Sequence, residues 1–307
     1  MNTTVPTLIP GKTDRVSPGV AAFRRIFLPL ETHMTMAGVF EEMRLSAMAR
    51  LPGEPAEGLF IKEPSGSAKS TVANRFCRRV EQLVGAELRK GPVRLITVGE
   101  EGTAKTFWSS ILEHLGDPYY ATGSEANLKK RVHKALKREG VVLLIVDELN
   151  HTVDKSHAGQ ILNAIKNMLT LGWVSIVVMG SSVELNRLPQ NDSFQARMLE
   201  SPGLPRLAWS DHAATWSTFC TKLDEQLVER LILRSASDLG TPARAQALCH
   251  ISEGLIGRLM WLVETALRNT LRRDADCISL ADLVSAGDSL LRKYPREGAV
   301  NPLAALC

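Results

Sequence analysis

The sequence has 307 residues, of which 44% are hydrophobic, and carries a formal net charge of +4 with a pI near 8.8. This length is sufficient for one large α/β domain and a smaller helical lid, and the charge is compatible with DNA but too small to indicate it. Neither a zinc site nor a disulfide framework is predicted, because CxxC spacing and clustered histidines are missing around the five cysteines, Cys77, Cys220, Cys249, Cys277 and Cys307.

The sequence also predicts no membrane segment. It contains no run of 18 or more apolar residues, and the N-terminal stretch MNTTVPTLIPGKTDRV lacks the basic-then-apolar order of a signal peptide. We therefore expect a cytoplasmic protein that does not associate with a membrane.

A candidate nucleotide-binding loop is the first motif along the chain. Residues 58–71, GLFIKEPSGSAKST, lead from an apolar strand into a Lys-Ser pair that opens a helix. The P-loop pattern G-x-x-x-x-G-K-[ST] curls backbone N–H groups around phosphates at a helix N-terminus. We therefore assign ATP contacts to the loop residues Glu63, Pro64, Ser65, Gly66, Ser67, Ala68, Lys69, Ser70 and Thr71. An ordinary strand-turn-helix connection is the alternative.

Two of these residues depart from the pattern, since Glu63 and Ala68 replace its glycines. If Ala68 takes a positive φ, the strain is on the order of 1 kcal/mol. A carboxylate at Glu63 repels a triphosphate unless it points away or pairs with a cation. Within the loop, Lys69 would reach the β- and γ-phosphates and Ser70 would bind Mg²⁺. Weakened affinity or slow turnover is therefore expected.

Two lysine-containing segments follow the loop. Residues 99–108, GEEGTAKTFW, place Lys105 and Thr106 on a Gly-flanked turn that could hold a phosphate backbone. Residues 124–139, SEANLKKRVHKALKRE, predict a helix with Leu128, Val132, Ala135 and Leu136 inward and Lys130, Lys134 and Lys137 outward. A solvated helix face is the alternative reading of this lysine stripe.

A second nucleotide motif lies at residues 141–148, VVLLIVDE. A continuous apolar run that ends in two carboxylates is typical of a buried parallel strand with a Walker B end. Asp147 would hold Mg²⁺, and Glu148 would polarise the water that attacks the γ-phosphate. The alternative is a core strand with a solvated acidic end.

A third strand is predicted at residues 174–182, VSIVVMGSS, after an amphipathic helix. Strand, helix and strand in this order predict a parallel sheet flanked by helices. Ser181, at the end of the strand, would contact the γ-phosphate or the attacking water as a sensor 1 residue, or would be a simple turn residue.

The predicted organisation has four parts. We expect a flexible arm over residues 1–20, an α/β core with a helical lead-in over 21–210, a helical lid over 211–290 and a flexible tail over 291–307.

The ordered motifs resemble one known family, the TniB and TnsC AAA+ ATPases of transposons, which are related to MuB. The resemblance covers roughly residues 20–285 and includes FRRIFLPLETHMTM, the loop variant, VVLLIVDELNHTVD, IVVMGSSVELNRLPQNDSFQARM and ISEGLIGRLMWLVETAL. It implies an AAA+ P-loop core with a small C-terminal helical lid, and ATP and Mg²⁺ as cofactors.

The resemblance implies further roles for individual residues. Arg197 in QARM would reach a neighbouring subunit's nucleotide, or would be a surface arginine that caps a helix. Arg258 would be a sensor 2 residue that contacts ATP, or one member of a helix-end ion pair. DNA contacts would be made by Lys105 first, with Thr106, and then by Lys129 and Lys130, through phosphates and without sequence preference.

Two functions follow from the resemblance. The first is an ATP-hydrolysing regulator that assembles as rings or filaments on double-stranded DNA and recruits a transposase and a TniQ-like targeting adaptor. The alternative is a nucleotide-bound scaffold for transposition proteins that hydrolyses ATP poorly. A replication initiator or loader of the AAA+ class is a more distant possibility.

Overall fold

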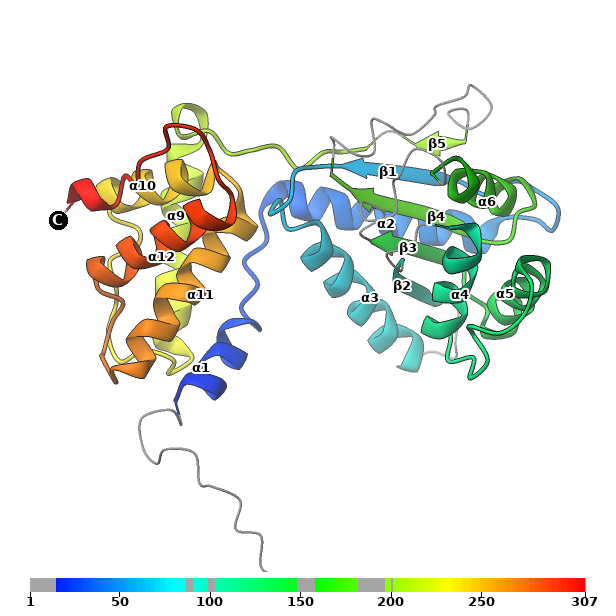
Figure 1. The fold of residues 1–307 in the computed structure, drawn as a ribbon, viewed down its shortest axis with the longest axis horizontal. Coiled ribbons are helices and arrows are strands. Elements are labelled where there is room, and N and C mark those ends of the chain that lie inside the picture. Colours follow the sequence, from blue (N-terminus) through cyan, green and yellow to red (C-terminus); the bar gives the residue numbers. More distant parts are fainter. Residues whose placement is uncertain are drawn as a thin grey trace, which may run out of the picture. The chain divides into compact units, whose positions relative to one another are not determined.

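The computed structural model describes residues 15–86, 91–98, 103–147, 158–181, 197–199 and 201–306 (Figure 1). These residues form two compact units, and the boundary between the units differs from the predicted one. The first unit spans residues 30–204, and the second combines residues 15–29 with 205–306.

The first unit is a five-stranded parallel sheet flanked by helices, as the sequence predicts. Its strand order is β2-β3-β4-β1-β5, and every recorded strand pair is parallel. The strands are β1 (Gly58–Lys62), β2 (Val93–Thr97), β3 (Leu143–Asp147), β4 (Ser175–Gly180) and β5 (Met198–Leu199). The helices are α2 (Glu31–Ala49), α3 (Lys69–Ala86), α4 (Ala104–His114), α5 (Glu125–Glu139) and α6 (Ala158–Thr170).

Side chains alternate between the two faces of this sheet, as the pleat of a strand requires. In β1, Leu59 and Ile61 pack in one apolar cluster with residues of α2 and α3, whereas Phe60 packs in the other cluster with residues of α4, α5 and α6. Figure 1 shows α2 and α3 on one side of the strands and α4, α5 and α6 on the other. Both faces are covered, so β3 and β4 are buried along their whole length.

The helix α5 confirms the predicted orientation of its two faces. Leu128, Val132, Ala135 and Leu136 are buried, and Lys130, Lys134 and Lys137 are exposed. Its N-cap, Ser124, accepts a hydrogen bond from the Asn127 amide at 3.3 Å, and its C-cap, Gly140, takes a left-handed φ of 65°.

The second unit is helical. It contains α1 (Val16–Phe23), α9 (Trp209–Glu229), α10 (Pro242–Ser252), α11 (Ile256–Arg272), α12 (Leu280–Lys293) and a short 3₁₀ turn at Ala304–Leu306. Within the part of the chain that the structure describes, no helix is long and apolar enough to cross a bilayer.

Residues 1–14 of the predicted arm lie outside the described residues, whereas residues 15–20 and the predicted tail make contacts within the helical unit. α1 begins at Val16, buries Val20 and Phe23, and packs against α11, where Arg24 forms a bidentate ion pair with Glu264. Near the C-terminus, Leu303 is fully buried, and the Asn301 amide donates to the Val284 carbonyl at 2.9 Å. These contacts join distant segments, so residues 15–29 and the end of the chain belong to the helical unit.

Candidate nucleotide-binding site

The loop between β1 and α3 has the curled backbone that a phosphate-binding turn needs. Gly66 and Ala68 both have a positive φ, of 89° and 71°, and the Ser67 amide donates to the Pro64 carbonyl at 3.2 Å. α3 begins directly after this turn, at Lys69, so the N-terminus of the helix faces the loop. The structure therefore places Ala68 in the strained conformation that the sequence suggested.

Replacing Ala68 by glycine is expected to stabilise the nucleotide-free protein by about 1 kcal/mol, because glycine adopts a left-handed φ without the Cβ clash. The free energy of unfolding in urea would measure this gain. Ala126→Gly in the first turn of α5 is the matched control, and we expect it to lower the stability by roughly 0.5–1 kcal/mol. A loss of stability in Ala68→Gly would contradict the argument.

Lys69 lies inside the curl of the loop. Its side chain is buried, and its ammonium group donates to the carbonyl oxygens of Glu63 at 2.6 Å and Pro64 at 2.9 Å, and to the Ser67 hydroxyl at 3.4 Å. A buried ammonium group is stable only when its N–H groups have acceptors. The loop therefore holds a positive charge at the point where α3 begins.

The other loop residues differ from Lys69 in their exposure and contacts. Ser65, Ser70 and Thr71 are exposed, and the Ser70 carbonyl accepts a hydrogen bond from the Asn74 amide at 2.8 Å. The Glu63 backbone amide donates to the Gly180 carbonyl of β4 at 3.2 Å. The Glu63 carboxylate extends toward Gly203, where a Cβ atom would lie 3.5 Å from its Oε1 atom.

Asp147 lies at the same edge of the sheet as the loop. It is the last residue of β3, is buried, and is in register with Thr97 of β2. Only β4 separates β3 from β1, so the ends of these two strands are about 10 Å apart. The half-buried Ser181 follows the last residue of β4, between them. Glu148, the predicted catalytic carboxylate, lies outside the described residues.

Arg197 lies at the other side of the sheet, where the strands begin rather than where they end. Its carbonyl oxygen accepts a hydrogen bond from the Gly58 amide at 2.8 Å, and Gly58 is the first residue of β1. The length of β1 separates Gly58 from Lys62 and the nucleotide loop by roughly 13 Å. The structure therefore does not bring Arg197 together with the loop of its own chain.

Arg258 forms the ion pair that the sequence left open as an alternative. It lies in the first turn of α11, its guanidinium donates to the Glu253 carboxylate, and its Cζ atom is 4.3 Å from the Tyr294 ring centroid. Glu253 was missed at the sequence level, because spacing alone does not show which arginines gather around one carboxylate.

A model of the family described as bacterial TniB protein matches residues 33–207, more than half of the chain. The chain belongs to the TniB family. The match includes all of the parallel sheet and the nucleotide loop of this TniB chain. A search among curated proteins found no match.

Solved structures with the AAA+ fold resemble this TniB chain. The Aeropyrum pernix ORC2 protein in ADPNP–ADP complexes has a TM-score of 0.64 and 15% identity, covering 93% of this chain and 73% of its own. The A. pernix ORC1 protein in complex with DNA has a TM-score of 0.64 and 16% identity, covering 89% and 70%. Cdc6p from Pyrobaculum aerophilum has a TM-score of 0.57 and 11% identity, covering 88% and 70%. At these identities, the likeness shows a shared fold.

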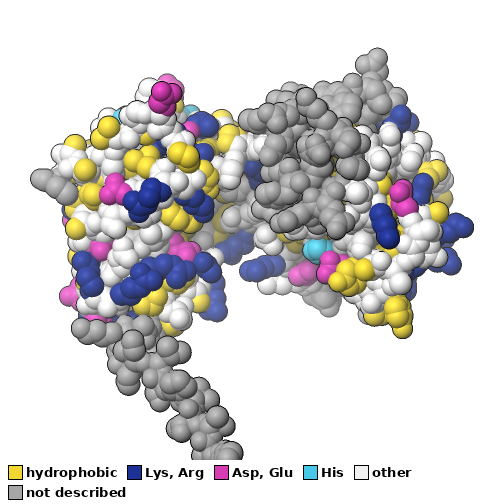
Figure 2. Space-filling view, viewed as in Figure 1, with side chains coloured by type: hydrophobic (Ala, Val, Ile, Leu, Met, Phe, Trp, Pro, Cys, Tyr) yellow, Lys and Arg dark blue, Asp and Glu magenta, His cyan; other side chains and the backbone are white. Residues whose placement is uncertain are grey.

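The predicted DNA contacts lie on two helices of the sheet unit. Lys105 is exposed in the first turn of α4, and the Thr106 amide donates to the N-cap Thr103 hydroxyl at 3.0 Å. Lys130 is exposed on α5, and the Lys129 ammonium lies 5.8 Å from the Trp173 ring centroid. Figure 2 shows Lys and Arg side chains at the rim of this unit where α5 lies.

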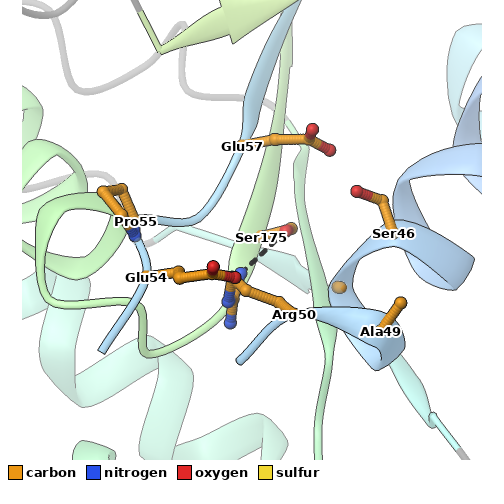
Figure 3. Close-up of a pocket in the computed structure, with 8 residues that line it drawn as sticks. Ser46, Ala49, Arg50, Glu54, Pro55, Glu57 and Ser175 are labelled. Carbon is orange, nitrogen blue, oxygen red and sulfur yellow. Dashed lines mark hydrogen bonds between the residues drawn. The ribbon is translucent and has the colours of Figure 1, made fainter. Parts of the chain in front are cut away.

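A cavity of about 320 Å³ lies where β1 and β4 begin (Figure 3). Arg50 extends into it and donates to the Gly172 carbonyl at 3.0 Å and the Ser175 hydroxyl at 3.4 Å. Burial lowers the pKa of Arg50, and the nearby carboxylates of Glu57 and Glu54 partly offset this effect. Arg50 thus ties the end of α2 to the start of β4.

Replacing Arg50 by methionine is expected to lower the free energy of unfolding by roughly 1–3 kcal/mol, because the Gly172 carbonyl loses a charged donor. Chemical unfolding would measure the loss. Arg138→Met is the control: Arg138 is exposed and pairs with its neighbour Glu139, so we expect a change below about 0.5 kcal/mol. Equal effects in the two variants would refute a structural role for Arg50.

Proposed function

We propose that this chain is an ATP-dependent, DNA-binding AAA+ regulator of transposition that assembles on target DNA and recruits a transposase. Membership of the TniB family supports the association with transposition. The observation that carries the ATPase part is the buried Lys69 in a curled loop at the N-terminus of α3, at the same sheet edge as the buried Asp147.

The loop fits a nucleoside triphosphate in two respects. Left-handed residues at Gly66 and Ala68 turn the backbone ahead of a helix N-terminus, and Lys69 places an ammonium group there. In the proposed complex, residues 63–71 would hold the phosphates, and Ser70 and Asp147 would hold Mg²⁺. The metal would neutralise charge that develops on the γ-phosphate.

The remaining site residues keep the roles predicted from the sequence. Glu148 would polarise the attacking water, and Ser181 would act as the sensor at the end of β4. Arg258 would respond to nucleotide state as a sensor 2 residue, in exchange for its contact with Glu253.

The position of Arg197 supports the assembly part of the proposal. Arg197 lies at the start of β1 and β5, whereas the nucleotide loop follows the end of β1. An arginine at that edge is suited to a nucleotide held by a second copy of the chain. Hydrolysis would then depend on contact between subunits in a ring or filament.

DNA would bind through phosphates at Lys105, Thr106, Lys129 and Lys130. Such contacts give affinity that falls with salt and depends little on sequence. The A. pernix ORC1 protein, which shares the fold, was solved in complex with DNA. A TniQ-like adaptor and a transposase would then bind the assembled protein.

The test is ATP hydrolysis by the purified protein with and without duplex DNA, with electron microscopy of the same samples. DNA-stimulated turnover that disappears in Glu148→Gln, together with ordered assemblies on DNA, is the expected result. If the protein neither binds ATP nor assembles on DNA, the proposed function is wrong.

The second candidate function is a nucleotide-bound scaffold with poor turnover, and the strained Ala68 and the carboxylate of Glu63 favour it. On this view, a Glu63→Gly, Ala68→Gly variant should bind ATP more tightly by roughly tenfold, since the carboxylate that repels the phosphates is removed. Titration with a fluorescent ATP analogue would measure the change. Equal affinity in the variant and the natural sequence would show that Glu63 and Ala68 do not weaken ATP binding.

A further inference from the structure

Three arginines surround one carboxylate in the helical unit. Glu253 accepts contacts from Arg206 and Arg258, and its Oε1 atom lies 3.4 Å from Arg296 Nε. The three arginines come from three separate segments: the stretch before α9, the start of α11 and the stretch after α12. Three guanidinium groups around one carboxylate leave an excess of two positive charges.

The backbone around Glu253 is fixed in place. Glu253 caps α10 with a left-handed φ of 56°, and Gly254 follows with a φ of 66°. A Cβ atom at Gly254 would lie 2.4 Å from the Leu207 carbonyl oxygen, and the Leu207 amide donates to the Gly254 carbonyl at 2.9 Å. This close approach requires glycine and holds the segment of Arg206 beside the carboxylate.

Arg258 forms the buried base of the cluster. Its side chain is 10% exposed, it stacks on Tyr294, and its Nε atom is buried without a hydrogen-bond partner among the described residues. A buried donor without an acceptor is costly, at roughly 1–3 kcal/mol. Arg258 is held at this position by its ion pair with Glu253 and its contact with Tyr294.

Arg206 and Arg296 form the open part of the cluster, with side chains that are 49% and 33% exposed. Arg296 Nη2 donates to the Ile251 carbonyl at 3.0 Å, which fixes its guanidinium plane. Positive charge continues at the exposed Lys293, whose ammonium lies 4.6 Å from the Trp261 ring centroid and 5.6 Å from that of Tyr294. Figure 2 shows Lys and Arg side chains gathered in groups on the visible face of the helical unit.

Glu253 stays ionised in this setting. Burial raises the pKa of its carboxyl group, but the hydrogen bonds and charges of Arg206 and Arg258 together outweigh burial and lower the pKa overall. The carboxylate therefore orders the arginines in advance, which reduces the entropy cost of binding a ligand. It also competes with any anion for the same guanidinium groups.

We propose that Arg206 and Arg296, arranged by Glu253 above the buried Arg258, form a phosphate-binding site in the helical unit that contacts the backbone of duplex DNA. This inference rests on the proposed function, because it adds a DNA contact beyond Lys105, Thr106, Lys129 and Lys130. Nucleic acid is favoured over a single free phosphate because the positive charge extends from the cluster to Lys293. Arginine suits this role through bidentate hydrogen bonds to phosphate oxygens.

The experiment measures the affinity of the full-length protein for duplex DNA across a salt series. It is done with the natural sequence as the reference, with and without a saturating non-hydrolysable ATP analogue, so that DNA binding that depends on ATP is preserved in every comparison. Arg206→Gln with Arg296→Gln should weaken binding and reduce the slope of log affinity against log salt by about 1.8, since each lost phosphate contact removes about 0.9. Glu253→Gln should strengthen binding by roughly tenfold, because it removes the competing negative charge.

The gain in Glu253→Gln separates a binding site from a structural ion-pair cluster, because loss of a purely structural carboxylate would not raise affinity for DNA. Glu264→Gln is the matched control: Glu264 also pairs with two arginines of the helical unit, Arg24 and Arg268. We expect its effect on the affinity to be at most about twofold. Thermal unfolding of every variant checks that the protein folds.

The possible outcomes are distinct. If DNA binding is unchanged in both cluster variants but is lost in a Lys105, Lys129 and Lys130 triple variant, the inference is wrong and the proposed function stands. Displacement of DNA from the cluster by pyrophosphate at micromolar concentration would also overturn the inference, since the site would then prefer a small phosphate ligand. If the natural sequence binds no DNA, both the inference and the DNA part of the proposed function fail.

Discussion

Lys69→Met is expected to lower the affinity for ATP by roughly 100-fold, or about 3 kcal/mol, the value of one or two charge-assisted hydrogen bonds. The ammonium group of Lys69 is already held inside the loop by the Glu63 and Pro64 carbonyl oxygens, at 2.6 and 2.9 Å. Methionine keeps the length of the buried stem but removes the charge. Titration with a fluorescent ATP analogue would measure the loss.

The control for this variant is Lys222→Met, because Lys222 is exposed on α9 in the helical unit. We expect its affinity for ATP to equal that of the natural sequence, which would show that the loss in Lys69→Met comes from the loop and not from the reduced net charge. If Lys69→Met bound ATP normally, the loop would be only a strand-turn-helix connection.

The core of the fold could be predicted from the sequence because its signals are local. Residues 141–148 form one apolar run that ends in two carboxylates, and the structure shows β3 as a buried strand that ends at the first of them, Asp147. Helical spacing in residues 124–139 likewise predicted which side of α5 is buried. Two strands joined by one helix are parallel, so the carboxyl ends of the strands lie at the same side of the sheet. Asp147 and the nucleotide loop both follow such ends and could therefore be expected to lie close together.

Contacts between distant segments could not be predicted in the same way. β5 has only two residues, Met198 and Leu199, and is defined by its pairing with β1 rather than by a pattern of its own. The prolines and the lost periodicity after residue 292 suggested a flexible tail, yet Leu303 is fully buried. One buried side chain leaves no periodic signal.

The candidate site shows the same division. Sequence motifs were sufficient to select Lys69, Asp147 and Ser181 as site residues. Only the structure shows that Ala68 has a left-handed φ and that the Lys69 side chain points into the loop. The partner of Arg258 is a clear case, since the sequence left open whether it serves as a sensor or in an ion pair. The structure shows the ion pair with Glu253, and its role toward nucleotide stays a prediction.

Arg197→Ala is expected to reduce DNA-stimulated ATP hydrolysis by roughly 10³-fold or more, the effect of losing an arginine that stabilises charge on the transferred phosphate. Its own affinity for ATP should not change, because Arg197 lies at the far end of β1 from the loop, roughly 13 Å away. Measuring binding and turnover separately would therefore separate Arg197→Ala from Lys69→Met, which should lose both.

Mixing the two variants tests whether Arg197 acts on a neighbouring subunit. An Arg197→Ala subunit keeps a competent loop, and a Lys69→Met subunit keeps Arg197, so an assembly of both contains interfaces in which one subunit holds ATP and the other supplies the arginine. We expect turnover to recover in the mixture, although each variant alone is inactive. If each variant is inactive and no mixing ratio restores turnover, Arg197 does not complete a site in trans, and its position at the start of β1 and β5 then reflects a structural role.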